Sequence, residues 1–253
     1  MIPYFLLHSF SIGPLTIQVW GLFVALGILL GTVVASWFAK RLGLAKDSIW
    51  DSALWLVVGG VVGARLFHIL VYNPGYYVWH PLEIPAIWQG GMSMIGGLMG
   101  AALMGAWFVR RRKLDWRSYL NVWSFGLPFG IAVGRIGCFL IHDHPGTLTS
   151  FVLGVKYPDG VVRHDLGLYE SIYGFVLASA FLFLEWKRPG KTPYTGILFF
   201  TYGLFRLGAD FLRISDTAGA DVRYLGLTPT QYISFLLVMA GAWLLYKKLS
   251  DKN

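Results

Sequence analysis

Seven apolar stretches, each long enough to cross a bilayer, restrict this chain to a helical membrane fold. They cover residues 19–39, 52–71, 92–109, 121–141, 168–186, 194–213 and 228–246. A hydrocarbon core about 30 Å thick needs about 20 apolar residues in a helix that rises about 1.5 Å per residue. The composition agrees, since 56% of the 253 residues are hydrophobic and only 13% are charged, unlike a soluble domain. The sequence therefore predicts an all-α integral membrane protein with seven transmembrane helices in a single domain, residues 1–253.

The basic residues predict how these helices are oriented. Fourteen of the 21 lysines and arginines lie in the loops after the first, third, fifth and seventh stretches, whereas the opposite loops hold only Lys156, Arg163 and Arg223. Because cytoplasmic loops of membrane proteins are enriched in basic residues, we expect the N-terminus outside and the C-terminus in the cytoplasm. The net charge of +8 is then mostly a consequence of topology, and we do not expect nucleic-acid binding.

Two extramembrane segments are predicted on the outer face. Residues 1–18 lack the basic start of a cleavable signal peptide and are interrupted by two prolines and a glycine, so we expect an amphipathic arm at the membrane surface. Residues 142–166 form the longest outer insertion. The Asp159-Gly160 pair between two β-prone runs predicts a small hairpin there.

Arg135 is a charged residue inside the fourth apolar stretch, which continues as GLPFGIAVGRIGCFLIHDHPG from residue 126 to residue 146. A guanidinium stays protonated, so it is costly in hydrocarbon unless it faces protein, water or an anion. The alternative is that Arg135 extends to the lipid headgroups and takes no part in chemistry. Its position favours a polar site within the membrane.

The sixth stretch predicts a row of polar residues on one helical face. In FTYGLFRLGADFLR, Tyr202, Arg206, Asp210 and Arg213 follow one another at intervals of four, four and three residues. Residues at these intervals lie on one side of a helix. Such a row cannot face lipid, and Asp210 is placed to pair with either arginine.

Arginines in three apolar stretches, with few carboxylates, predict a cationic cavity inside the membrane. The second stretch contributes Arg65, and the natural occupant of the cavity is the phosphate of a phospholipid. Gly96 and Gly97, in GGMSMIGGLMGA, allow the backbone to approach a ligand or another helix. The sequence has no zinc-type histidine cluster, no P-loop and no nucleophile elbow, and Cys138 has no CxxC partner, so we expect no metal or other cofactor.

Several motifs together resemble the prolipoprotein diacylglyceryl transferases. GARLFHILVYN, GGMSMIGGLMG, LPFGIAVGRIGCFL, RHDLGLYE and YGLFRLGADFLR occur in the order and at the intervals of that family, over nearly the whole chain. The resemblance implies an enzyme of the bacterial plasma membrane that spans it seven times and faces the outer leaflet with its active site. It implies transfer of the diacylglyceryl group of phosphatidylglycerol to the lipobox cysteine of a prolipoprotein, with formation of a thioether and release of glycerol phosphate. Phosphatidylglycerol, the prolipoprotein signal peptide and membrane lipids are then the expected partners.

The resemblance also assigns roles to residues. Arg135 and Arg206 match the essential arginines and are expected to clamp the departing phosphate, where they stabilise the transition state. The expected substrate-binding residues are Arg65, Tyr72, Gly96, Gly97, Tyr169, Glu170, Tyr202, Asp210 and Arg213.

Six positions depart from the pattern of that family: Trp20 replaces a tyrosine, Asn121 an aspartate and Asp210 a glutamate, and three further changes bear on the catalytic base. Ile95 replaces the histidine of its His-Gly-Gly-Leu motif, Cys138 replaces an asparagine, and Asp143 replaces a glutamate. Isoleucine cannot accept a proton, so we expect His142, Asp143 or His144 to act as the base. Alternatively, the cationic cluster lowers the pKa of the acceptor thiol enough that little help from a base is needed. We expect Cys138 itself to be a small packing residue.

Two other functions stay open from the sequence. A divergent transferase that uses another lipid donor or acceptor would explain the replaced histidine. A membrane protein that binds anionic phospholipid without turnover would also keep the arginine cavity. The presence of the whole set Arg135, Glu170, Tyr202 and Arg206 argues against this second alternative, because lipid binding alone does not require all four.

Overall fold

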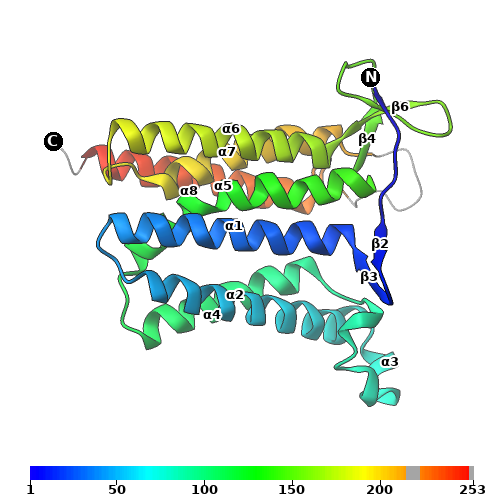
Figure 1. Cartoon of the computed structure of the whole chain (residues 1–253), viewed down its shortest axis with the longest axis horizontal. Helices are drawn as coiled ribbons and strands as arrows, with labels where there is room; N and C mark the ends of the chain where they lie inside the picture. The colour runs from blue at the N-terminus through cyan, green and yellow to red at the C-terminus, as the bar shows by residue number, and fades with distance from the viewer. Residues whose placement is uncertain (215–222, 251–253) are drawn as a thin grey trace. The chain divides into compact units, whose positions relative to one another are not determined.

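The computed structural model describes residues 1–214 and 223–250, and most of them are helical (Figure 1). The long helices are α1 (Val19–Arg41), α2 (Lys46–Phe67), α4 (Met94–Arg111), α5 (Trp116–Ile141), α6 (Leu166–Lys187), α7 (Tyr194–Ala209) and α8 (Pro229–Ser250). A π-helical turn at His68–Tyr72 extends α2, and the short helix α3 (Pro74–Trp79) follows it. The mainly helical class predicted from the sequence is confirmed.

Five helical segments are long and apolar enough to cross a membrane. They are Val19–Arg41, Lys46–Tyr72, Trp116–Ile141, Leu166–Lys187 and Pro229–Ser250, which makes the chain a multi-pass membrane protein. The third and sixth predicted spans correspond to α4 and α7, which have 18 and 16 residues. Because these two helices are shorter, the count of seven spans stays a prediction.

Helix α7 ends earlier than the sequence predicts. The expected span reaches residue 213, but the helix stops at Ala209, and Asp210–Leu212 forms one 3-10 turn. Arg213 is extended, with φ −68° and ψ 146°, because its backbone pairs with Gly146 in an antiparallel bridge. Arg213 therefore does not continue the helical row of Tyr202, Arg206 and Asp210.

The chain divides into two compact units, Met1–Leu42 with Leu120–Asn253 and Gly43–Tyr119. In the smaller unit, α2 packs closely on α4 through glycines. A Cβ atom added at Gly100 would lie 2.1 Å from the carbonyl oxygen of Gly59, and one at Gly96 would lie 2.5 Å from that of Gly63. Small residues of this kind let two membrane helices approach closely. The glycine-rich third stretch thus serves helix contact, one of the two uses expected for it.

In the larger unit, α1, α5, α6, α7 and α8 lie side by side (Figure 1). Four helices contribute one buried aromatic ring each to the core: Phe38, Phe125, Phe181 and Tyr194. The rings of Phe38 and Phe125 stack with centroids 4.3 Å apart, and Tyr194 meets Phe125 edge-on at 4.8 Å. Aromatic pairs in these geometries contribute about 0.5–1.5 kcal/mol each beyond the area they bury. This cluster holds in place the helices that carry the polar site.

Short strands lie at one end of these helices (Figure 1). They are β1 (Ile2–Pro3), β2 (Ser9–Ile12), β3 (Leu15–Gln18), β4 (Pro145–Leu148), β5 (Val155–Lys156) and β6 (Val162–Asp165). One sheet has the order β1-β5-β6-β4, in which β1 is parallel to β5 and the other pairs are antiparallel; β2 and β3 form a separate hairpin. The hairpin predicted around Asp159 and Gly160 is confirmed, and Gly160 has a φ of +84° that favours glycine.

Candidate active site

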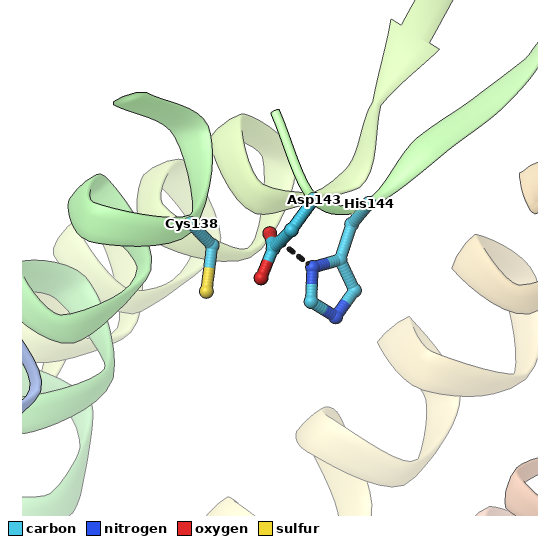
Figure 2. A group of neighbouring side chains, drawn as sticks. All are labelled: Cys138, Asp143 and His144. Carbon is cyan, nitrogen blue, oxygen red and sulfur yellow. Dashed lines mark hydrogen bonds and ion pairs between the residues drawn. The ribbon is translucent and has the colours of Figure 1, made fainter. Parts of the chain in front are cut away.

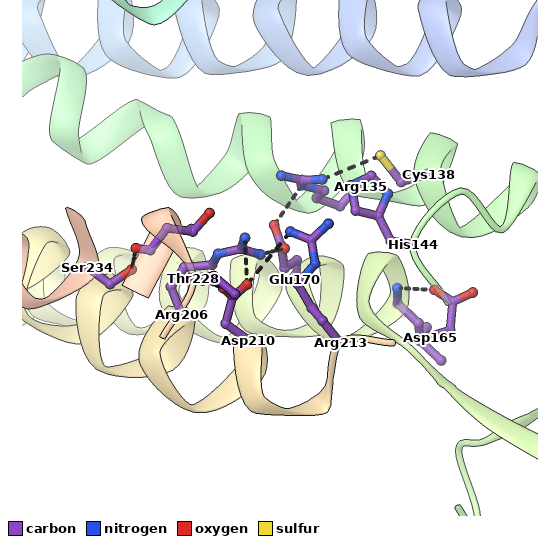
Figure 3. Close-up of polar contacts among 12 residues, drawn as sticks. Arg135, Cys138, His144, Asp165, Glu170, Arg206, Asp210, Arg213, Thr228 and Ser234 are labelled. Carbon is purple, nitrogen blue, oxygen red and sulfur yellow. Dashed lines mark hydrogen bonds and ion pairs between the residues drawn. The ribbon is translucent and has the colours of Figure 1, made fainter. Parts of the chain in front are cut away.

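Five charged residues come together in the larger unit, and we call them the arginine cluster (Figure 3). They are Arg135 of α5, Glu170 of α6, Arg206 of α7, and Asp210 and Arg213 from the segment after α7. All five were expected from the sequence at a catalytic or substrate-binding site. The structure brings them together from helices that are far apart in the chain.

Glu170 connects the two arginines expected to bind phosphate. Its Oε2 atom lies 2.7 Å from Nε of Arg135, and its Oε1 atom accepts a hydrogen bond from Nη1 of Arg206. The carboxylate is almost completely buried, with 1% of the side chain exposed. A charge buried this deeply is tolerated because two guanidinium groups neutralise it. Glu170 therefore sets the spacing of the arginines and is itself covered by them.

Asp210 organises the other side of the cluster. It accepts a hydrogen bond from Nη2 of Arg206 at 3.2 Å, and Nη1 of Arg213 lies 3.8 Å from the same oxygen. Its second oxygen accepts a hydrogen bond from the Thr228 hydroxyl. The sequence-based expectation that Asp210 pairs with either arginine is confirmed for both.

Thr228 ties the start of α8 to the cluster. The backbone N–H of Thr228 donates to Oε1 of Gln231 at 3.0 Å, and the N–H of Gln231 donates to the Thr228 hydroxyl at 3.2 Å. This reciprocal pair is a capping box, which satisfies two backbone donors at a helix N-terminus. The Thr228 hydroxyl thus caps the N-terminus of α8 and also binds Asp210.

Among the described residues, the cluster brings three arginines together with two carboxylates. Part of the cluster is open: 26% of the Arg135 side chain and 24% of the Arg213 side chain are exposed, whereas Arg206 is buried. A partly open guanidinium held by a buried carboxylate is suited to bind an anion such as a phosphate. This is the chemistry predicted from the sequence.

Two tyrosines expected at the site occupy different surroundings. Tyr202 lies within electrostatic reach of Glu170, Arg206 and Arg135. Tyr169 instead contacts His164, with its hydroxyl 2.6 Å from Nδ1 of the imidazole. Burial lowers the pKa of His164, which favours the neutral ring. Direct binding of substrate by Tyr169, which the sequence predicts, is not tested by this contact.

The three expected bases divide into two groups. Asp143 and His144 contact each other beside Cys138, and Nη1 of Arg135 donates to the Cys138 sulfur at 3.6 Å (Figures 2 and 3). His142 faces a different partner, Asp165, which lies 2.7 Å from its Nδ1 atom. The geometry favours Asp143 and His144 as the groups that act near the arginine cluster.

His142 is a buried anchor of the four-stranded sheet. Its ring stacks on Tyr4 at 4.9 Å and lies edge-on to Tyr157 at 5.9 Å between centroids. Burial also raises the pKa of Tyr157 well above its usual value. The partner of His142, Asp165, caps α6 by accepting a hydrogen bond from the Leu168 N–H at 3.0 Å. The His142–Asp165 pair therefore joins the end of α5 to the start of α6.

Arg65 belongs to the smaller unit and has four backbone partners. Its guanidinium donates to the carbonyl oxygens of Ile84, Gly90, Gly91 and Glu83 at 2.8, 2.7, 3.2 and 2.6 Å. These bonds hold residues 83–91 against the end of α2. The contacts indicate a positioning residue for this loop, and direct binding of phosphate by Arg65 stays a prediction.

The other expected residues of the smaller unit lie at its surface or in its helix contact. Tyr72 is exposed, and its ring approaches those of Phe67 and His68. Gly97, like Gly96, faces α2, where an added Cβ atom would lie 3.4 Å from the carbonyl oxygen of Gly60. Ile95, at the position of the replaced histidine, is 46% exposed.

Comparisons with known proteins show which family the chain is similar to. The family described as prolipoprotein diacylglyceryl transferase matches residues 8–247. The phosphatidylglycerol–prolipoprotein diacylglyceryl transferase of Nitrosomonas europaea is 35% identical over 250 residues, which cover 96% of this chain and 90% of that protein. The protein of the same name from Brucella canis is 32% identical over 261 residues, covering 94% of this chain and 90% of that protein. The chain belongs to the prolipoprotein diacylglyceryl transferase family.

This member of the diacylglyceryl transferase family has site residues that sequence reasoning missed. Thr228 and Gln231 support Asp210 from α8, and the capping-box spacing Thr-x-x-Gln before an apolar run was the signal that could have found them. Cys138, expected only to pack, contacts Arg135 and lies beside Asp143 and His144. Its place depends on the turn after α5, which no local pattern predicts.

Proposed function

We propose that the arginine cluster holds the phosphate of phosphatidylglycerol while its diacylglyceryl group moves to a prolipoprotein cysteine. The family supplies the reaction, and the observation that carries the assignment of the site is the bridge from Glu170 to both Arg135 and Arg206. Two guanidinium groups held by one buried carboxylate form a preorganised site for an anion that gains charge during the reaction.

The reaction is a displacement at a glycerol carbon. The acceptor thiol loses its proton, the thiolate sulfur forms a bond to the carbon, and the carbon–oxygen bond to the phosphate breaks. The electron pair leaves with glycerol phosphate. Because the leaving phosphate gains charge in the transition state, Arg135 and Arg206 bind it more tightly there than in the substrate, which lowers the barrier.

Each remaining member of the cluster has a positioning role in this proposal. Glu170 fixes the arginine pair, and Asp210 holds Arg206 against the start of α8 through Thr228. Arg213 adds positive charge at the exposed side, where a headgroup would enter. Asp143 and His144 are the titratable groups beside Cys138 and are candidates to accept the thiol proton.

The membrane arrangement is part of the proposal. Seven spans, counting α4 and α7, in a single domain would place the N-terminus outside and the basic loops in the cytoplasm of a bacterium. The arginine cluster would then open to the outer leaflet of the plasma membrane. Ser11→Cys and Ser250→Cys, each in a Cys138→Ser background, test this orientation by labelling with a membrane-impermeant maleimide. Labelling of residue 250 but not residue 11 in intact spheroplasts would contradict it.

The deciding experiment measures diacylglyceryl transfer from phosphatidylglycerol to a lipobox peptide by the purified protein. We expect Arg135→Ala and Arg206→Ala to lower the rate by about 10²-fold or more, as loss of one transition-state donor does elsewhere. Arg112→Ala is the control, because Arg112 is exposed and pairs with Asp51. Phosphatidylglycerol binding without turnover by the unaltered protein would instead favour another acceptor or a binding role.

A further inference from the structure

Cys138, Asp143 and His144 form a cluster of metal-ligating side chains. Each offers one ligand atom, and these atoms lie within 4.8 Å of one another. The sulfur, the carboxylate and the imidazole point into the same space (Figure 2). The sequence predicted no metal site, because three ligands separated by a helix end do not form a recognisable motif.

The turn after α5 creates this arrangement. Helix α5 ends at Ile141, and His142 takes a positive φ of 49° that reverses the chain. The His142 ring is held by Asp165, so the two residues that follow turn back towards Cys138 in the last turn of the helix. The cluster is therefore built on a buried anchor and not on a free loop.

The ligand set matches the preferences of zinc. Zinc binds cysteine sulfur, histidine nitrogen and carboxylate oxygen, and sites with three protein ligands leave a fourth position open. Tetrahedral bond lengths of about 2.0–2.3 Å place ligand atoms about 3.3–3.7 Å apart. The Asp143 carboxylate and Nδ1 of His144 are hydrogen-bonded to each other, so zinc binding has to open this contact while the more distant ligand atoms close in by about 1 Å. The partial exposure of Asp143 and His144, 31% and 26% of their side chains, leaves room for this adjustment and for a fourth ligand.

The charges also allow a dication at this place. One thiolate and one carboxylate neutralise Zn²⁺, and the charge of neighbouring Arg135 is offset by Glu170 at 2.7 Å. A neutral zinc unit therefore meets no like-charge repulsion from Arg135. When an anionic sulfur takes the fourth position, it brings negative charge next to the same guanidinium.

We propose that Cys138, Asp143 and His144 bind a zinc ion whose open position takes the thiol of the acceptor cysteine. This inference rests on the proposed transferase function and explains how the thiol is activated where Ile95 cannot act as a base. Asp143 and His144 then serve as zinc ligands instead of accepting the thiol proton themselves. A thiol bound to zinc is deprotonated and remains a sulfur nucleophile. Its proton passes to solvent, the sulfur attacks the glycerol carbon, and the phosphate departs to the arginine cluster with the electron pair. The thioether product is neutral and a weaker ligand than a thiolate, so it leaves the metal.

The first test measures the metal directly. Purified protein is stripped with a chelator and reloaded with zinc or with cobalt(II), and bound metal and cobalt absorption are recorded. We expect one zinc per chain and a sulfur-to-cobalt charge-transfer band. Cys138→Ser should remove the band, and His144→Ala should lower zinc occupancy at least tenfold, whereas His8→Ala, an exposed control, should change neither. Unfolding curves check that each variant is folded. Absence of bound zinc, or equal zinc in the folded Cys138→Ser protein, would overturn the site.

The second test links zinc to the reaction. Transfer is measured with stripped and reloaded protein, and phosphatidylglycerol binding is measured in the same samples. We expect stripping to lower the transfer rate at least tenfold, reloading to restore it, and lipid binding to change little. Full transfer by the stripped protein would overturn the role of zinc while leaving the transferase function intact. Absence of transfer in every sample, with zinc bound, would overturn the proposed transferase function and with it the role of zinc.

Discussion

The Oε2 atom of Glu170 lies 2.7 Å from Nε of Arg135, and almost none of the carboxylate is exposed. The other oxygen of Glu170 pairs with Arg206, so one buried side chain determines the distance between the two arginines. Removing one member of a buried charge group usually costs more than the group contributes, because it leaves the partners unpaired. The cluster should therefore respond to small changes at Glu170.

Glu170→Gln should impair both stability and catalysis. The amide keeps the shape of the side chain but removes the negative charge that faces Arg135 and Arg206, and Arg206 then keeps only Asp210 as a counter-charge. We expect the free energy of unfolding to fall by about 3 kcal/mol and the transfer rate to fall by about 10²-fold or more. Thermal unfolding in detergent and the transfer assay measure the two effects. Asp51→Asn, which removes an exposed ion pair, should change the free energy of unfolding by less than about 1 kcal/mol, and an equal loss in both variants would refute the special role of Glu170.

Arg135→Lys should separate charge from geometry. Lysine keeps the positive charge but offers one compact ammonium group in place of the planar fork that reaches Glu170 through Nε and Cys138 through Nη1. We expect kcat to fall by about 10²-fold, with a smaller change in the affinity for phosphatidylglycerol. Arg112→Lys is the matched control. If Arg135→Lys retains the full rate, positive charge alone is sufficient at this position.

Thr228→Ala should lower stability through two lost contacts. The hydroxyl caps α8 and donates to the buried Asp210, and loss of an N-cap hydroxyl alone costs about 0.5–2 kcal/mol. We expect a loss of about 2 kcal/mol in the free energy of unfolding, largely rescued by Thr228→Ser. Thr230→Ala is the control from the same helical turn, since the Thr230 side chain makes no hydrogen bond within residues 1–214 and 223–250. An equal effect of the two alanine substitutions would contradict the capping role.

Gly100→Ala should disturb the packing of α2 on α4. The added Cβ atom would lie 2.1 Å from the carbonyl oxygen of Gly59, so the backbones have to move apart. Overpacking of this kind costs about 1–3 kcal/mol, which unfolding curves detect. Gly75→Ala in the same unit is the control, because nothing lies within 4 Å of its added Cβ atom. An unchanged midpoint for Gly100→Ala would show that the two helices separate easily.

The stability of the protein should fall in mild acid because of His164. Burial lowers the pKa of His164 below its usual 6.5, so the unfolded chain binds a proton more readily than the folded protein. The stabilising effect is complete above about pH 6.5 and is lost as the pH falls through the lower folded-state pKa. His164→Gln should reduce the difference between unfolding midpoints at about pH 7.5 and about pH 5, whereas His80→Gln, at an exposed histidine, should not.

The sequence by itself determined the helical membrane class, the family and the partnership of Arg206 with Asp210. Apolar length and helical spacing are local properties, so they can be read without knowing which helices pack together. The Asp-Gly hairpin of the four-stranded sheet was predictable for the same reason, since its turn depends on two adjacent residues. Helical spacing applies only within a helix. Arg213 lies beyond the last turn of α7, so the prediction that it shares a helical face with Tyr202, Arg206 and Asp210 was wrong.

The tertiary structure alone decided which distant side chains meet. It placed Glu170 between Arg135 and Arg206, although these three residues come from different helices. It gave Arg65 four carbonyl partners in a loop and brought Asp143 and His144 back to Cys138. Such contacts depend on how whole helices pack and where a chain reverses, because a buried charge is stable only where several elements bring its partners together.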